Sequence, residues 1–336
     1  MSRKIFTHLS LPSVAFCLCV SAVAVAAQEK KTTTTTKTTK TTTTKQADQD
    51  HVQINGSSLR WEHRSGGDDG TDIVLASKNV EFNDDYTDVE RFTKGDGYFR
   101  LSETRGGMVR RLEIAPGADG ALKREYWERG AARPFDEGAR KWLARLLSDT
   151  VAGSGYDAEA RVEKILRRGG AGAVLAEMAR LKNDYARRVY STALVERGNL
   201  SGEQLAKLLA QNAKAMASDY EKATLLIHVL KNDLADAGVR AAFFETAGTL
   251  SSDYERGRVL SVLLKRRDVS AETLLLALKS TRGMSSDFEK ANVLIRAAGT
   301  GAADETVRAA IIEAAHALSS DYERGRVLTA VTKKSL

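Results

Sequence analysis

The chain has 336 residues, including 51 Lys and Arg, 44 Asp and Glu, two Cys and three Pro. This length allows two domains and a sizeable buried core. The formal net charge of +7 comes almost wholly from the first 47 residues, because residues 48–336 hold 44 basic and 43 acidic side chains. A nearly neutral globular part argues against a nucleic-acid-binding domain, and we expect no nucleic acid among the partners.

The first 27 residues have the features of a secretory signal peptide. Arg3 and Lys4 form a charged start, the mostly apolar run Leu9–Val25 follows, and alanines stand where a leader peptidase would cut. The alternative is an uncleaved membrane anchor, but serines and Pro12 interrupt the run, which falls short of the roughly 20 apolar residues of a comfortable span. We predict that residues 1–27 are removed and that the mature chain has no integral membrane span.

A threonine-rich tract follows the signal peptide. Residues 32–45 contain 11 Thr in 14 residues and no apolar side chain. Such a segment buries too little surface to offset its ordering entropy, so residues 28–49 are predicted to be a disordered tether. Its lysines could instead lie against an anionic membrane or cell-wall surface, although a solvated linker is the simpler interpretation.

Residues 50–134 are predicted to form a small antiparallel β domain. Apolar residues alternate with polar ones over 58–63, 72–76, 79–82, 97–104, 108–114 and 121–128, and Gly-rich turns separate these segments. The connection through Gly106 and Gly107 is typical of a tight hairpin. We expect a meander of five or six strands with one apolar face, which includes Phe99, Leu101, Leu112, Ile114 and Tyr126.

Residues 135–155 supply a cover for that face and a linker. After Pro134-Phe135-Asp136, the residues Trp142, Leu143, Leu146 and Leu147 recur at helical spacing. This pattern predicts a helix from about 136 to 147 that packs on the sheet.

The region 156–336 is dominated by a tandem repeat. An Asp-aromatic dipeptide recurs at intervals of 34 or 35 residues, starting at Asp184, Asp219, Asp253, Asp287 and Asp321, and SSDYERGRVL occurs both at 251–260 and at 319–328. A period of this length holds two helices and two short turns. The fold class predicted is therefore α+β: a small antiparallel β-meander followed by an α-solenoid of 34-residue helical hairpins.

Several features define the units of this solenoid. Ser252 with Glu255 has the spacing of a capping box, which three other units repeat. The helices between the dipeptide helices are expected at 201–215, 234–249, 270–281 and 303–318, after an irregular first pair at 157–168 and 171–182. The position of Gly257 is small in the other units as well (Ala223, Ala291, Gly325), which predicts a close helix–helix approach.

The units have the character of short HEAT-type repeats. Together with GYFRLSE, RRLEI, RPFDEGARKWLARLL and the SSDYERGRVL units, they make residues 75–336 resemble the extracytoplasmic region of antirepressor-type (beta-lactam-sensor-like) membrane metallopeptidase proteins and related secreted repeat proteins. Such peptidases carry several membrane spans and an HExxH zinc motif, and this chain has neither. The resemblance implies a sensor-like or binding region without the peptidase domain.

A search for catalytic chemistry in the sequence gives no constellation. Cys17 and Cys19 lie in the leader, and the four other histidines after His8 lack the spacing of a zinc site. Acidic segments at 68–72 and 83–88 lack a full calcium loop, so Asx-turns are the simpler interpretation. We predict no enzyme activity, no metal and no cofactor. The alternative is an envelope-polymer hydrolase that acts through the strand domain, with carboxylates drawn from Glu103, Glu113 and Glu125.

The candidate contact residues belong to the repeat helices. The aromatic residues Tyr185, Tyr220, Tyr254, Phe288 and Tyr322 form a regular series, in which each ring packs against the next unit or the row faces an extended peptide. Packing is the simpler interpretation, because Phe288 lacks the hydroxyl. Arg258 and Arg326 lie on the polar side of their helices, where they either contact a partner or pair with a glutamate three residues away.

These patterns together predict a non-catalytic exported protein-interaction module, of scaffold or sensor-like type, located in the periplasm or secreted from a bacterial envelope. Its partner would be a protein or peptide held on the helical-repeat surface, with Arg258, Arg326, Tyr220, Tyr254 and Tyr322 as the candidate contact residues.

Overall fold

The computed structural model describes residues 49–64, 70–231, 234–266, 269–301 and 304–334. The predicted signal peptide 1–27 and nearly all of the predicted tether 28–49 lie outside these residues. Within the described residues, none of the helices combines the length and the apolar character that crossing a membrane requires.

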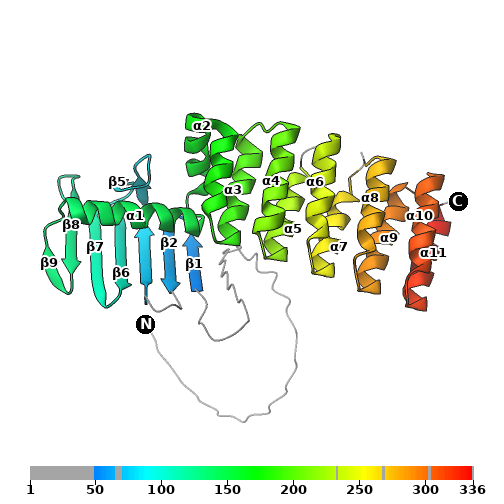
Figure 1. The fold of residues 1–336 in the computed structure, drawn as a ribbon, viewed down its shortest axis with the longest axis horizontal. Helices are drawn as coiled ribbons and strands as arrows, with labels where there is room; N and C mark the ends of the chain where they lie inside the picture. Colours follow the sequence, from blue (N-terminus) through cyan, green and yellow to red (C-terminus); the bar gives the residue numbers. More distant parts are fainter. Residues whose placement is uncertain (1–48, 65–69, 232–233, 267–268, 302–303, 335–336) are drawn as a thin grey trace, which may run out of the picture. The chain divides into compact units, whose positions relative to one another are not determined.

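The N-terminal part is an antiparallel sheet with a small side hairpin (Figure 1). Its main sheet has the order β1-β2-β3-β6-β7-β8-β9, and β4 pairs with β5 in a separate two-stranded sheet between β3 and β6. The strands are β1 (Gln49–Asn55), β2 (Ser58–Arg64), β3 (Asp72–Lys78), β4 (Val80–Phe82), β5 (Val89–Phe92), β6 (Tyr98–Arg105), β7 (Met108–Pro116), β8 (Leu122–Glu128) and β9 (Ala131–Arg133).

All six strand segments expected from the sequence are present, and β1, β5 and β9 are additional. The connection from β6 to β7 is the expected tight turn, with Gly106 and Gly107 both at positive φ and Arg105 opposite Met108. A similar two-residue turn through Gly56, also at positive φ, joins β1 to β2. Both turns use glycine because left-handed backbone conformations cost it no steric strain.

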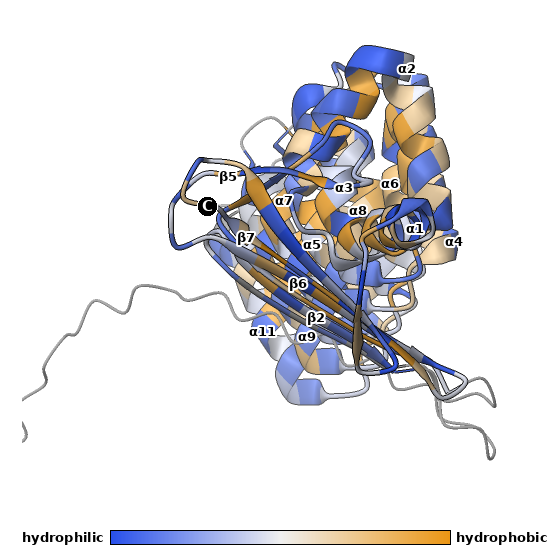
Figure 2. Ribbon diagram, turned by 90° about the vertical axis from the view of Figure 1, so that its left-hand side faces the viewer, coloured by the Kyte–Doolittle hydropathy of each residue, from blue (hydrophilic) through white to orange (hydrophobic). Residues whose placement is uncertain are grey.

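Helix α1 (Glu137–Ser154) covers the apolar face of the sheet, as Figure 2 shows. Asp136 caps its first turn by accepting a hydrogen bond from the Ala139 N–H, and Gly155 ends it in a left-handed conformation. The helix is longer than the predicted 136–147, because Val151 and Ala152 continue its buried stripe. The Trp142 ring lies 5.6 Å from the ring of Tyr126, so the expected cover is confirmed.

The rest of the described chain is a series of helices in two rows (Figure 1). Helices α3 (Asp184–Arg197), α5 (Asp219–Val229), α7 (Asp253–Leu263), α9 (Asp287–Gly301) and α11 (Asp321–Lys334) each begin at the aspartate of a dipeptide. The other row has α2 (Ala158–Arg180), α4 (Gly202–Ala215), α6 (Ala237–Gly248), α8 (Ala271–Thr281) and α10 (Glu305–His316). The predicted α+β class with a helical-repeat region is confirmed.

Helix α2 contains the expected irregular first pair. The predicted break falls at Gly170, whose φ of 66° and ψ of −170° are not helical, so that α2 consists of two helical segments joined at a kink. Only glycine adopts such a conformation without strain, so this residue produces the kink.

The small residues allow neighbouring units to approach closely. Ala223 and Ala291 are fully buried, and a Cβ at Gly257 would lie 3.0 Å from Oε2 of Glu289 in the next unit. At Gly325, in the last described unit, a Cβ would meet nothing within 4 Å. The predicted close approach is therefore confirmed wherever another unit follows.

The start of α2 also contacts the loop between β4 and β5. The buried Tyr86 hydroxyl donates a hydrogen bond of 2.7 Å to Oδ2 of Asp157, and the guanidinium of Arg161 lies over the Tyr86 ring. Burial raises the pKa of the Asp157 carboxyl, and the Tyr86 hydrogen bond opposes that shift without cancelling it. Burial likewise raises the pKa of Tyr86.

Candidate functional site

The aspartate of each dipeptide joins its unit to the next one. Ser285 N–H and Ser286 N–H both donate to Oδ2 of Asp253 at 2.7 Å. Asp184 accepts in the same way from residues 217 and 218, Asp219 from 251 and 252, and Asp287 from 320. A carboxylate that accepts two backbone amides holds the loop before the next helix in a fixed position. We call this arrangement the aspartate clasp.

The clasp explains why the predicted capping boxes are only half formed. The Ser252 hydroxyl accepts from the Glu255 N–H as expected. In a full box the Glu255 carboxylate would accept from the Ser252 N–H, but that N–H donates to Asp219 instead. The Glu255 carboxylate pairs with Arg258 at 2.8 Å. The expectation of reciprocal boxes in these units was therefore wrong, because a stronger acceptor from the preceding unit takes the amide.

The row of aromatic side chains is largely open to solvent. Tyr220 is 55 % exposed, Tyr254 63 %, Phe288 55 % and Tyr322 75 %. Each ring belongs to the second residue of its helix. These four rings are therefore not buried between units, although Tyr220 and Phe288 each contact an arginine of the next unit, and Tyr185, the first ring of the series, is half-buried. A Phe at one position is equally compatible with an exposed apolar contact.

The two arginines predicted as contact residues, Arg258 and Arg326, each cover one ring of this row. The Arg258 guanidinium lies 5.1 Å from the centre of the Tyr220 ring, and its Nη2 donates to Oγ1 of Thr224 at 3.1 Å. Arg326 lies 5.8 Å from the Phe288 ring and donates to Oδ1 of Asn292 at 3.2 Å. Each arginine belongs to the unit after the ring it covers, so these cation–π contacts also link units.

The structure therefore brings the predicted contact residues into one row, but they differ in how far they are exposed. Arg258 pairs with Glu255 and covers Tyr220, and Arg326 in the same way pairs with Glu323 and covers Phe288. Tyr254 and Tyr322 are the more exposed rings. A row of aromatic side chains flanked by half-buried arginines is chemically suited to the apolar side chains and backbone carbonyls of a polypeptide.

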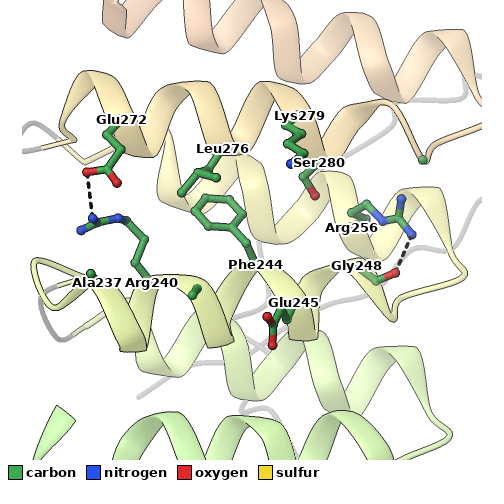
Figure 3. A pocket seen from close by; sticks show the side chains of 12 residues that line it. Ala237, Arg240, Phe244, Glu245, Gly248, Arg256, Glu272, Leu276, Lys279 and Ser280 are labelled. Carbon is green, nitrogen blue, oxygen red and sulfur yellow. Dashed lines mark hydrogen bonds and ion pairs between the residues drawn. The ribbon is translucent and has the colours of Figure 1, made fainter. Parts of the chain in front are cut away.

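Apart from the aromatic row, a groove lies between α6 and α8, as Figure 3 shows. Its volume is about 800 Å³. Phe244 and Leu276 point toward one another in its middle. One end is closed by the ion pair between Arg240 and Glu272, whose nitrogen and oxygen lie 2.8 Å apart. Arg256, from the start of α7, lines the other end.

Sequence reasoning missed this groove and the role of Arg256. At the spacing of a helix, Arg256 is a charged residue on the same side as the apolar Val259, Leu260 and Leu263. The structure shows why it is tolerated there: its Nη2 donates to the carbonyl oxygens of Gly248 and Leu250. The signal that was available is the recurrence of a basic residue at the same position of every unit, namely Arg187, Lys222, Arg256, Lys290 and Arg324.

The carboxylates considered for a hydrolase lie on opposite faces of the sheet. Glu103 is buried under α1, where it accepts from Nε1 of Trp142 at 2.7 Å and from Arg145 at 3.1 Å. Glu113 and Glu125 face each other across β7 and β8 on the other face. Arg100 and Arg111 lie near Glu113, and Lys123 pairs with Glu125. Neither face brings Glu103 together with the other two.

The remaining polar motifs have local partners. Oδ1 of Asn83 accepts from the backbone N–H groups of Thr87 and Asp88, four and five residues further on, which closes this loop in a different way from the predicted Asx-turn. His228 lies 3.2 Å from Glu196, and burial lowers its pKa. Of the residues with assigned positions, no three His, Cys, Asp or Glu gather as they would around a metal ion.

Comparison with known proteins adds no family: no protein-family model, no curated protein and no solved structure matches this chain.

Proposed function

We propose that this chain is a non-catalytic protein-interaction module that binds a protein or peptide through its helical-repeat surface. The observation that carries the proposal is the row of four aromatic rings that are more than half exposed, one from each of four successive units. Large apolar side chains held open in this way cost solvation free energy unless a partner covers them.

The geometry of the row favours a polypeptide as the partner. Successive helices in a packed stack are about 10 Å apart, which is close to the length of three residues of an extended chain. Each ring therefore has the spacing to contact every third residue of a bound strand. The aspartate clasps fix the helix starts that carry the rings, so the row needs little ordering on binding.

The proposed location is the periplasm or the outside of a bacterial cell, and it rests on the leader-like residues 1–27. The partner would then be an envelope or secreted protein. No nucleic acid is proposed, because residues 48–336 taken together are nearly neutral.

The test is affinity capture from an envelope extract with the full chain and two triple variants. In the first variant, Tyr220, Tyr254 and Phe288 are replaced by serine, and in the control the exposed Lys207, Lys214 and Glu313 are replaced by serine. A partner retained by the wild type and the control but lost by the ring variant supports the proposal. Equal capture by all three proteins contradicts it.

A further inference from the structure

The basic residue at the fourth position of each dipeptide helix has its charge compensated differently in one unit. Arg187, Lys222, Lys290 and Arg324 each lie within 4 Å of the aspartate three residues before them. Arg256 makes no ion pair with any carboxylate of the described residues, although only 7 % of its surface is exposed. Two backbone carbonyls share its Nη2.

A buried cation without a counter-charge is costly, and carbonyl dipoles offset that cost only in part. The compensation that the other four units find in their own aspartate is therefore missing here. Because Arg256 lines the end of the groove between α6 and α8, a ligand in that groove can supply the missing negative charge.

Neighbouring groups strengthen this preference. Lys279 and Ser280 of α8 lie at the same end of the groove (Figure 3). Lys279 has no partner in the described part of the chain, and the buried Ser280 Oγ has none there either. Glu245 also lines the groove, but its carboxylate is turned away from α8 in Figure 3, and Glu272 is already paired with Arg240 at the far end. Two cations and one hydroxyl thus lie at this end of the groove.

Gly283 keeps this end of the groove open. A Cβ at this position would lie 2.6 Å from Nη1 of Arg256, so any other residue would displace the guanidinium. Nη1 lies beside Gly283 of the groove lining and has no acceptor among the described residues, so the planar guanidinium can offer it to a carboxylate as a charge-assisted donor.

The length and lining of the groove indicate what carries the carboxylate. From Ala237 to Gly248 the groove follows α6 for about 16 Å at 1.5 Å per residue, which is about five residues of an extended peptide. Phe244 and Leu276 supply apolar contacts between its two polar ends. A small inorganic anion would leave that apolar middle unused, whereas a short peptide segment would fill it.

We infer that the groove between α6 and α8 binds a short peptide segment of a partner protein, with a carboxylate at Arg256 and Lys279 and an apolar side chain at Phe244 and Leu276. This inference rests on the proposed function and adds the chemistry of the partner. The carboxylate belongs either to an Asp or Glu side chain or to the C-terminus of the peptide.

The test uses the full chain and a positional-scanning library of fluorescein-labelled hexapeptides, made with free and with amidated C-termini, and measures fluorescence anisotropy. We expect sub-libraries that fix an acidic and a large apolar residue to bind more tightly than the others, or peptides with a free C-terminus to bind more tightly than their amidated forms. In either case, added salt should weaken the binding. A side-chain carboxylate binds equally in both forms, whereas a terminal carboxylate binds only in the free form.

Arg256→Gln has a matched control in Arg324→Gln, because the two arginines occupy the same position of identical decapeptides. Arg256→Gln should weaken binding by about tenfold or more, and Arg324→Gln should leave it within about twofold. Lys279→Glu, at an exposed position, should weaken binding equally without lowering the thermal midpoint, which covers the case in which Arg256→Gln fails to fold.

The inference is overturned if acidic peptides and free C-termini bind no better than basic, amidated ones, or if Lys279→Glu binds like the wild type. This failure is distinct from failure of the proposed function. A partner lost by the serine variant of the aromatic row but retained by Lys279→Glu would leave the proposed function standing and remove the groove from it.

Discussion

Replacing Asp253 by alanine removes one aspartate clasp and leaves the rest of the helix start intact. Two backbone amides, of Ser285 and Ser286, then lose an acceptor at 2.7 Å. A hydrogen bond to a charged group contributes about 1.5–3 kcal/mol, but the exposed Ser285 amide recovers a bond to water. We therefore expect the free energy of unfolding to fall by about 2–3 kcal/mol, chiefly from the half-buried Ser286 amide.

Asp321→Ala is the internal control for this variant. Asp321 occupies the same position of an identical decapeptide, so both changes remove the same favourable charge from a helix N-terminus. The side chain of Asp321 is 90 % exposed and pairs only with Arg324, in the last unit of the described chain. Its loss should lower the free energy of unfolding by at most about 1 kcal/mol, which is the contribution of a charge at a helix N-terminus.

Chemical denaturation gives the two free energies, and hydrogen exchange locates the effect. Asp253→Ala should lose amide protection at 284–294, which follow the broken clasp, whereas Asp321→Ala should not. Because repeat arrays unfold in nearest-neighbour steps, the exchange data remain interpretable when the denaturation curve is not two-state. Equal destabilisation by the two variants would refute the clasp as the link between units.

Three further outcomes follow from single contacts. Burial raises the pKa of Asp157, so ionisation of this carboxyl disfavours folding. The stability that the protonated carboxyl contributes is fully present below the pKa of the unfolded chain and is lost as the pH rises through the folded pKa. The stability gained by Asp157→Asn in urea titrations should therefore grow with pH, and a constant difference would contradict it. Gly325→Ala should raise the free energy of unfolding by about 0.5–1 kcal/mol, because alanine favours the helix and nothing lies within 4 Å of the added Cβ. Gly257→Ala should raise it by less, because its Cβ would lie 3.0 Å from a carboxylate oxygen of the next unit. Equal increases for the two variants would argue against a close approach of neighbouring units at Gly257. Glu103→Ala should cost about 2–4 kcal/mol because the Trp142 N–H loses its acceptor, and Glu103→Gln, which keeps an acceptor, should cost clearly less in the same denaturation assay.

The repeat helices could be predicted closely because their starts are marked in the sequence. A serine or asparagine cap, the aspartate and the aromatic residue fix where α3, α5, α7 and α9 begin. The apolar face of the sheet and its covering helix followed from simple alternation and from the spacing around Trp142. These patterns involve residues that are close together in the chain, so they can be recognised in a single sequence.

The additional strands had weaker signals. Strands β5 and β9 are only four and three residues long, too short for a period to be recognised. Strand β1 had one usable signal, since Asn55-Gly56 is a dipeptide typical of hairpin turns.

The aspartate clasp and the groove depend on contacts between units and could not be derived from periodicity. The recurring aspartate marked the repeat, but its acceptor role needs the loop of the next unit to approach it. The groove exists because α6 packs more closely against α4 than against α8. That difference in spacing follows from the packing of whole helices and not from any one motif.

The most direct test of the central claim is photo-crosslinking at the aromatic row in living cells of the source organism. A benzophenone amino acid is placed at Tyr254 and, as a control, at Val109, an exposed apolar position on the strand domain. The account predicts a discrete protein adduct at position 254 that is absent at 109. No adduct at 254, or the same adduct at both positions, would contradict binding of a partner through the repeat surface.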